Sequence, residues 1–196
     1  MKTDIILAGV GGQGILSIAA IVSISALNKG LYIKQSEVHG MSQRGGDVQS
    51  NLRLSDKPIY SDLIAEGTAD LVLSLEPIEA LRYKHYLKKD GWLITNSKPF
   101  NNITNYPDEK KWRSEIESYP NHVLIDAEKI AKEIGSVLTA NVVLAGAASS
   151  YLGLTYNDLE NGIREIFGRK GDTVVNMNLE ALRRGKAFAE KELLNK

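Results

Sequence analysis

The chain has 196 residues, of which 43% are hydrophobic and 24% charged, a composition typical of a globular protein forming one domain over residues 1–196. Its 24 lysines and arginines equal its 24 aspartates and glutamates, so no overall charge would attract nucleic acid or an acidic membrane surface. It contains no cysteine, which excludes disulfides, cysteine nucleophiles and cysteine-ligated zinc or iron–sulfur sites, and we expect a cytoplasmic protein.

The first part of the chain alternates apolar segments with glycine-rich connections. Periodicity and turn residues predict strand 4–8, helix 12–28, strand 31–34, loop 36–46 and strand 48–54, with 58–60 as a partner for the last strand. Gly9, Gly11 and Gly14 interrupt the apolar N-terminal stretch, so it indicates a buried strand and helix rather than a signal peptide or a membrane span.

From residue 70 onward strands and helices continue to alternate until the chain becomes entirely helical. Glu76 and Pro77 predict a helix start, because proline suits the first turn and an acid suits the positive end of the helix dipole. The predicted strands are 70–75, 91–95 and 123–125, the predicted helices are 76–87, 127–134, 140–152, 156–167 and 175–194, and 97–121 is a polar surface excursion with a short helix. The pattern predicts an α/β fold, three-layer and Rossmann-like, with a mostly parallel sheet, helices on both faces and a helical C-terminus.

The loop 36–46 is the most informative stretch. Its polar side chains lie between glycines that allow unusual backbone conformations, and the members of interest are Glu37, His39, Gly40, Ser42, Gln43, Arg44, Gly45 and Gly46. Polar groups on such a loop at the end of a strand commonly contact a ligand or a partner. The alternative is an exposed polar turn.

A second signal is the pattern Gly9-x-Gly11-x-x-Gly14 between an apolar strand and an apolar helix. In this context glycines allow a tight turn and let backbone N–H groups approach an anion. The acidic ribose ligand of a dinucleotide site belongs at the end of the second strand, where Glu37 is the available acid. The pattern therefore favours a Rossmann-like fold and leaves open whether the glycines bind a ligand or serve helix–strand packing.

Ligands of parallel α/β folds bind beyond the carboxyl ends of the strands. The loop 9–14, the loop 36–46 and Asn96 after a later strand all fall there, so we expect them to converge. Of the three histidines, His85 and His122 are expected to be solvated or structural, and His39 fixes a loop or an interface or relays a proton. No nucleophile elbow, metalloprotease helix or Walker loop is present, so no self-sufficient catalytic constellation is predicted.

Together these residues resemble the gamma-type domain of the 2-oxoacid:ferredoxin oxidoreductases. The matching pieces, in order and over nearly the whole chain, are Gly9-Val-Gly-Gly-Gln-Gly14, Glu37-Val-His-Gly-Met-Ser-Gln-Arg-Gly-Gly46, Ala69-Asp-Leu-Val-Leu near Glu76-Pro-Ile-Glu-Ala-Leu-Arg82, and Asn96. The side chains of the second piece favour the aryl-pyruvate branch, which acts on indolepyruvate.

The resemblance implies a reaction in which an aryl 2-oxoacid, coenzyme A and oxidised ferredoxin give an acyl-CoA, carbon dioxide and reduced ferredoxin. It also implies that thiamine diphosphate, Mg²⁺ and the iron–sulfur clusters belong to a large alpha subunit, so this chain alone holds none of them, and that ferredoxin is reached through the complex. The candidate site or interface residues are Gly9, Gly11, Gly12, Gln13, Gly14, Glu37, Gly40, Ser42, Gln43, Arg44, Gly45, Gly46 and Asn96, with His39 and Arg44 as catalytic candidates and no metal ligand.

Two other interpretations remain open from the sequence. The chain is a stand-alone Rossmann-type enzyme that binds NAD(P) or ATP through the glycine pattern, or it is a scaffold whose loops contact only protein. The lack of a clear catalytic partner weighs against the first of these.

Overall fold

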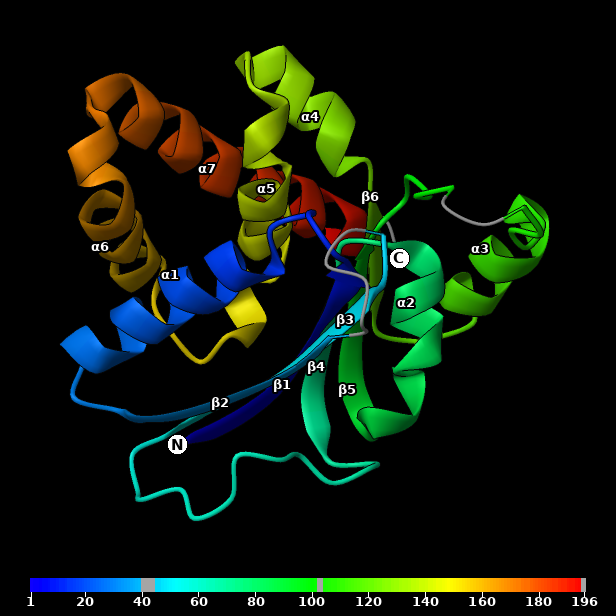
Figure 1. Cartoon of the computed structure of the whole chain (residues 1–196), viewed down its shortest axis with the longest axis horizontal. Coiled ribbons are helices and arrows are strands. Elements are labelled where there is room, and N and C mark those ends of the chain that lie inside the picture. The colour runs from blue at the N-terminus through cyan, green and yellow to red at the C-terminus, as the bar shows by residue number, and fades with distance from the viewer. Residues whose placement is uncertain (40–44, 102–103, 195–196) are drawn as a thin grey trace.

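The computed structural model describes residues 1–39, 45–101 and 104–194, apart from the side chain of His39. Its centre is a six-stranded sheet in the order β2-β3-β1-β4-β5-β6 (Figure 1). The strands are β1 Lys2–Val10, β2 Tyr32–His39, β3 Asp47–Ser55, β4 Ala69–Ser74, β5 Leu87–Asn96 and β6 His122–Ile125. Only β3 runs against the other five, because it pairs antiparallel with both β1 and β2 while β1, β4, β5 and β6 pair in parallel.

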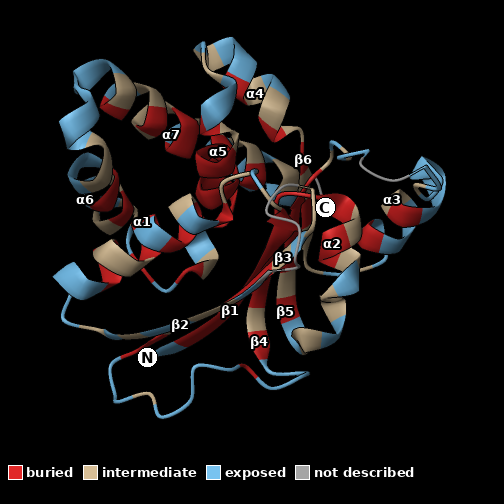
Figure 2. Ribbon diagram, in the orientation of Figure 1, coloured by how far each residue is buried: buried red, intermediate tan, exposed pale blue. Residues whose placement is uncertain are grey.

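Helices cover both faces of this sheet (Figures 1 and 2). They are α1 Ile15–Asn28, α2 Pro77–Arg82, α3 Glu109–Glu117, α4 Ala127–Ile134, α5 Ala140–Ala147, α6 Tyr156–Phe167 and α7 Asp172–Leu194, with short 3-10 turns at Lys84–Tyr86, Val137–Thr139, Ser149–Tyr151 and Gly168–Lys170. The predicted α/β class, with a mostly parallel sheet, helices on both faces and a helical C-terminus, is confirmed.

Two apolar cores lie on the two faces. The larger core packs α1, α5, α6 and α7 against alternate residues of the strands, such as Ile5, Leu7 and Leu52. The smaller core packs α2 and α3 against the other face, around Ile6, and buries Trp112 of α3. The alternation follows from the period of two in a strand, which sends neighbouring side chains to opposite faces.

Helices α5 and α7 approach closely because of two glycines. A Cβ atom at Gly146 would lie 2.1 Å from the carbonyl oxygen of Leu182, and one at Gly185 would lie 1.9 Å from that of Val143. Each glycine therefore leaves the space that the backbone of the facing helix fills. The close approach explains the small residues of the predicted helix 140–152. Among the described residues no helix is long and apolar enough to cross a membrane.

The structure corrects several predicted boundaries. Strand β2 continues to His39, so residues 36–39 belong to a strand and not to a loop. Residues 58–60 form no strand, because β1 and β2 are the partners of β3. Helix α2 ends at Arg82, and β5 begins at Leu87, which the sequence pattern placed in the helix.

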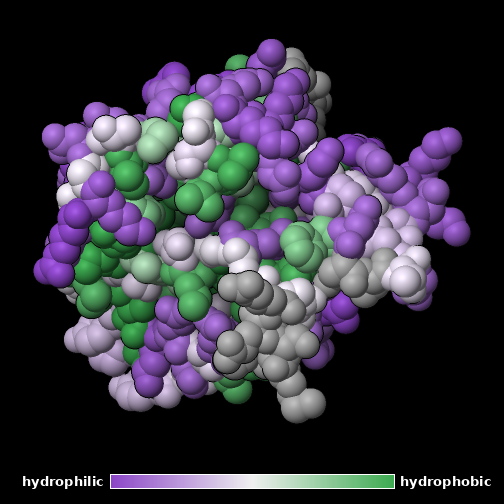
Figure 3. Space-filling model, turned by 45° about the horizontal axis from the view of Figure 1, so that its top comes forward, coloured by the Kyte–Doolittle hydropathy of each residue, from purple (hydrophilic) through white to green (hydrophobic). Residues whose placement is uncertain are grey.

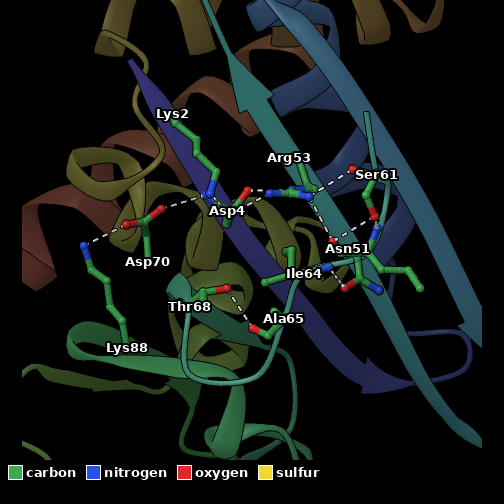
Figure 4. A network of polar contacts seen from close by, with 11 residues as sticks. Lys2, Asp4, Asn51, Arg53, Ser61, Ile64, Ala65, Thr68, Asp70 and Lys88 are labelled. Carbon is green, nitrogen blue, oxygen red and sulfur yellow. Dashed lines mark hydrogen bonds and ion pairs between the residues drawn. The ribbon is translucent and has the colours of Figure 1, made fainter. Parts of the chain in front are cut away.

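The connection from β3 to β4, residues 56–68, is attached to the sheet by Arg53 and by Asn51, whose Oδ1 accepts from the N–H of Ile64 at 3.1 Å. Arg53 donates two hydrogen bonds to the carboxylate of Asp4, which is fully buried, at 2.8 and 3.1 Å (Figure 4). The same guanidinium donates to the backbone oxygens of Ser61 and Leu63 at 3.0 and 2.9 Å. A planar group with five donors suits this role because it can bind a carboxylate and two carbonyl groups at once.

Candidate functional site

The carboxyl ends of the parallel strands meet the start of β3 at one edge of the sheet (Figure 1). There the glycine loop, residues 9–14, contacts the connection that ends at residue 46. The N–H group of Gly11 donates to the oxygen of Gly46 at 2.8 Å, and that of Gly45 donates to the oxygen of Gly11 at 3.4 Å. The predicted convergence of these two loops is confirmed for Gly45 and Gly46.

The glycine loop turns sharply into α1. Gly12 and Gly14 have φ angles of +100° and +92°, a left-handed backbone that favours glycine, and α1 begins directly after Gly14. Asn141, a buried residue of α5, donates from Nδ2 to the oxygen of Gly14 at 3.2 Å. The direction of the α1 N-terminus is thus fixed by the loop and by a second helix.

The side chain of Gln13 lies between the ends of β1 and β4. Its Oε1 accepts from the N–H of Val10 at 2.8 Å, and its Nε2 donates to the oxygen of Leu75 at 3.3 Å. Both ends of the amide are therefore bonded to backbone, one at the end of β1 and the other at the end of β4. From these two strand ends the chain passes to opposite faces of the sheet, to α1 and to α2.

A buried carboxylate follows β4. Glu76 is 1% exposed, and its oxygens accept from the N–H groups of Glu79 at 2.9 Å and Phe100 at 3.3 Å and from the hydroxyl of Tyr106. Burial, followed by the bond to Glu76, raises the pKa of Tyr106 well above its ordinary value. Sequence reasoning assigned Glu76 only to the helix start. The sequence signal that was missed is the pair of an acid directly after β4 and a tyrosine, 30 residues later, in the connection that follows β5.

A second polar cluster lies beside the start of β3. Tyr83 donates to Asp47 at 3.2 Å, and burial together with the Asp47 charge raises the pKa of Tyr83 to about 12. Glu79 receives Arg82 through two hydrogen bonds of 2.8 and 3.3 Å. Burial raises the pKa of Glu79, and the guanidinium of Arg82 counteracts this only in part. These contacts attach α2 to the strand that follows the 40–46 connection.

Asn96 lies at the same edge but is buried, at 3% exposure. Its Oδ1 accepts from the N–H of Ala127 at 3.1 Å, and its Nδ2 donates to the oxygen of Lys98 at 3.4 Å. The amide joins the end of β5 to the start of α4. Its predicted contact with a ligand stays a prediction.

Glu37 lies in β2 opposite Ser50 of β3. Strand β3 separates β2 from β1. Glu37 therefore lies on a strand that is two strand spacings, about 10 Å, from β1, the strand that leads into the glycine loop. In the usual Rossmann order the second strand neighbours the first, so an acid at its end reaches the ribose. The inserted strand removes that geometry. The other predicted residues of this stretch, Gly40, Ser42, Gln43 and Arg44, and the His39 side chain lie outside what the structure describes.

Apolar side chains are exposed beside the glycine loop. Leu16 lies two residues after Gly14 and is 55% exposed, while Val137 and Leu138, which lie shortly before Asn141, are 54% and 84% exposed. Figure 3 shows hydrophobic surface open on this face among hydrophilic patches.

A hollow of about 240 Å³ lies near the ends of β5 and β6. Three lysines and three acids line it, a balance that favours neither charge, namely Lys98, Asp126, Glu128, Lys129, Lys132 and Glu133. Among the described residues no group of three or more acids and histidines is placed to hold a metal ion.

The comparisons with known proteins agree with this architecture. The sequence model of the pyruvate ferredoxin/flavodoxin oxidoreductase family matches residues 4–188. The chain is 40% identical over 202 residues to the indolepyruvate oxidoreductase subunit IorB of Pyrococcus horikoshii, covering 98% of both chains, and 36% identical to that of Archaeoglobus fulgidus, covering 94% of both. Identity falls to 27%, over 92% of this chain and 95% of the relative, for the pyruvate/ketoisovalerate oxidoreductases common subunit gamma of Pyrococcus abyssi.

A solved relative adds the fold of a larger enzyme. The 2-oxoglutarate:ferredoxin oxidoreductase of Magnetococcus marinus, with 2-oxoglutarate, coenzyme A and succinyl-CoA bound, superposes with a TM-score of 0.76 at 26% identity. The superposition includes 97% of this chain but only 31% of that chain. The comparisons do not support the alternative of a stand-alone nucleotide-binding enzyme. The relatives are subunits or parts of oxidoreductases, and the chain belongs to the pyruvate ferredoxin/flavodoxin oxidoreductase family.

Proposed function

We propose that this chain is the small subunit of a cytoplasmic indolepyruvate:ferredoxin oxidoreductase and acts as one gamma-type domain. The complex converts an aryl 2-oxoacid and coenzyme A to an acyl-CoA and carbon dioxide, and the two electrons released pass to ferredoxin. The observation that carries the proposal is the end-to-end identity of 33–40% with indolepyruvate oxidoreductase subunits, against 27% with the common subunit gamma of Pyrococcus abyssi.

The division of cofactors supports a partner subunit. The chain has no cysteine for an iron–sulfur cluster, so the clusters are assigned to a large alpha subunit. The family resemblance assigns thiamine diphosphate and Mg²⁺ to the same subunit. The exposed Leu16, Val137 and Leu138 beside the glycine loop suit a contact with that subunit, because apolar surface of this kind marks interaction sites.

Coenzyme A is the cosubstrate that this chain itself is suited to contact. The N–H groups of Gly12, Gly14 and Ile15 have no acceptor among the described residues and lie at the start of α1. Backbone N–H groups at a helix N-terminus favour an anion, and coenzyme A carries phosphate groups. When bound, coenzyme A supplies the thiol that receives the acyl group. The glycine loop would then form one wall of a site that the partner completes.

Co-expression with a large thiamine and iron–sulfur subunit tests the proposal. We expect the two chains to purify together and to reduce ferredoxin when indolepyruvate and coenzyme A are present, with slower turnover of pyruvate and 2-oxoglutarate. The large subunit alone should be inactive or nearly so. Full activity of the large subunit without this chain contradicts the proposal.

Two side chains separate a role in turnover from a purely structural one. In the assembled complex we expect Arg44→Ala to lower kcat/KM by about tenfold or more, because a guanidinium can bind a phosphate or carboxylate through two hydrogen bonds. His39→Ala is tested beside it, with Arg169→Ala as an exposed control of the same charge. If the complexes of both variants assemble and turn over like wild type, this stretch of the chain contacts only protein.

A further inference from the structure

Gln13 stands in the glycine loop where a phosphate-binding pattern normally needs no particular side chain. Its amide is bonded at both ends to backbone, by Val10 N–H at 2.8 Å and by the oxygen of Leu75 at 3.3 Å. One bond closes the glycine loop on itself, and the other joins it to the end of β4. The side chain thus joins the ends of β1 and β4, from which the chain connections diverge to the two faces of the sheet.

The first glycine of the pattern makes room for this amide. A Cβ atom at Gly9 would lie 2.9 Å from Oε1 of Gln13, 3.0 Å from Cδ1 of Ile15 and 3.2 Å from Cβ of Leu75. Contacts below 3.0 Å are essentially never made by real Cβ atoms. Gly9 therefore leaves the space that the Gln13 amide, Ile15 and Leu75 occupy, independently of any ligand.

The bond to Leu75 continues into the neighbouring connections. Leu75 precedes Glu76, whose buried carboxylate accepts from Phe100 N–H and from the hydroxyl of Tyr106. On its other side the glycine loop is bonded to Gly46. Gln13 is the side chain that connects the glycine loop to the β4 end of this series, so its loss would remove that connection and leave the bonds of the loop to Gly46 and Asn141.

We propose that Gln13 is a positioning residue, whose amide holds the glycine loop against the end of β4 so that the N–H groups at the start of α1 keep their direction. It does not itself contact the bound group. The link from this role to coenzyme A rests on the function proposed above, whereas the anchoring of the loop does not.

Gln13→Glu gives a test that depends on protonation. A neutral carboxyl group keeps both bonds, because its carbonyl accepts from Val10 and its hydroxyl donates to Leu75, whereas a carboxylate opposes the Leu75 oxygen. The folded state therefore holds the proton more tightly, and the pKa of the introduced acid is raised above its unfolded value of about 4.3. The stability of the variant relative to wild type is retained below that value and lost as pH rises through the raised pKa.

Few native titratable groups complicate this profile. Helices α1 and α5, which flank the glycine loop, carry no ionisable residue. Of the described residues on the adjoining strand ends, Glu76 is bonded to Glu79, Phe100 and Tyr106, and Asp47 is bonded to Tyr83. The matched control is Gln35→Glu, because Gln35 is an exposed residue of β2 away from the glycine loop.

The measurements are the urea midpoint of the isolated full chain between pH 4 and 8, and the KM for coenzyme A and kcat of the reconstituted complex. We expect the urea midpoint of Gln13→Glu to fall relative to wild type as pH rises, whereas that of Gln35→Glu should show no such trend. The urea midpoint of Gln13→Ala should be lower than that of wild type at every pH. In the complex at pH 7, Gln13→Ala and Gln13→Glu should raise the KM for coenzyme A on the order of tenfold, with kcat nearly unchanged.

A pH profile of Gln13→Glu that parallels that of Gln35→Glu overturns the anchoring role. An unchanged KM in assembled complexes of both Gln13 variants overturns the positioning role even if stability falls, because the contact is then only structural. If the wild-type complex shows no turnover that depends on coenzyme A, the proposed function fails and takes the link to coenzyme A with it. The pH profile then still decides whether Gln13 anchors the loop.

Discussion

Glu76 shows how much of the site edge depends on single side chains. Its carboxylate is buried and accepts hydrogen bonds from the start of α2, from Phe100 and from Tyr106. Three donors satisfy a charge that would otherwise be costly to bury. The residue thereby attaches the connection after β5 to the end of β4, next to the glycine loop.

We expect Glu76→Gln to lower the free energy of unfolding by about 2 kcal/mol, because an amide cannot accept at all the positions where the carboxylate accepts. Tyr106→Phe should cost about 1 kcal/mol, and the double variant should cost less than the sum because the two residues share one bond. Urea unfolding at pH 7 measures all three, with the exposed Glu66→Gln as control. Strict additivity would show that the bond between Glu76 and Tyr106 does not contribute.

Among the elements, α5 and α7 depend on glycine for their close approach. Gly146→Ala should lower the free energy of unfolding by about 2–3 kcal/mol, because the added Cβ atom would lie 2.1 Å from a backbone oxygen that cannot rotate away. The control is Gly168→Ala, where nothing lies within 4 Å and φ is −54°, so we expect a change of about 0.5 kcal/mol or less, in either direction. Chemical denaturation compares the two. Equal effects would show that the helices separate at little cost.

The start of α6 carries a pH-dependent cap. Thr155 and Asp158 form a capping box, and Lys29 also bonds Asp158 at 2.9 Å. Burial acts to raise the pKa of Asp158, but the bonds from Thr155 and Lys29 outweigh it and the pKa is lowered. The folded state thus favours the carboxylate, so its contribution is present above the unfolded pKa of about 3.9 and is lost as pH falls through the lower folded value.

Asp158→Asn should accordingly lower the free energy of unfolding by about 1 kcal/mol at pH 7, and the difference from wild type should shrink as the pH approaches about 2. Urea titrations at several pH values measure the difference, with Asp62→Asn as an exposed control. A gap that stays constant with pH would exclude the carboxylate charge as its source.

At the scale of the whole molecule, one inserted strand decides how the glycine pattern is used. Because β3 lies between β1 and β2, the acid on β2 is removed from the glycine loop, and the start of β3 takes its place beside that loop. Residues 9–14, 45–46 and 75–76 are then joined by hydrogen bonds at this end of the sheet. The acid of β2 therefore does not lie beside the glycine loop, as it does in the usual dinucleotide cleft.

At the opposite end of the sheet, Arg53 joins the buried Asp4 to the backbone oxygens of Ser61 and Leu63 in the 56–68 connection. Arg53→Ala should lower the free energy of unfolding by about 3 kcal/mol, because the buried Asp4 would keep only its contact with Lys2. Arg183→Ala removes an exposed ion pair and should change stability very little. Denaturation at two salt concentrations checks both. A loss for Arg53→Ala that disappears at high salt would show that the pair behaves as a surface pair.

The sequence predicted regular elements well where periodicity was strong. The helix 156–167 was predicted with its observed bounds, and strands 48–54 and 123–125 were each within a residue or two. The prediction failed where pairing or packing with a distant part of the chain decided the structure. Residues 36–39 are polar except for Val38 and gave no strand signal, but pairing with β3 makes them part of β2. The excursion 97–121 looked like surface, yet Trp112 and Ile116 are buried because α3 covers the second face of the sheet.

By itself the sequence determined the α/β class, the position of the glycine loop at a strand end and the absence of cysteine chemistry, because these depend on local periodicity and composition. Only the tertiary structure decided the strand order, the contact of residues 9–14 with 45–46 and the bonds of Gln13 and Glu76. Those features join residues that are far apart in the chain. Hydrogen bonds between distant backbone groups form only when the folded sheet brings them together, and local patterns carry no record of them.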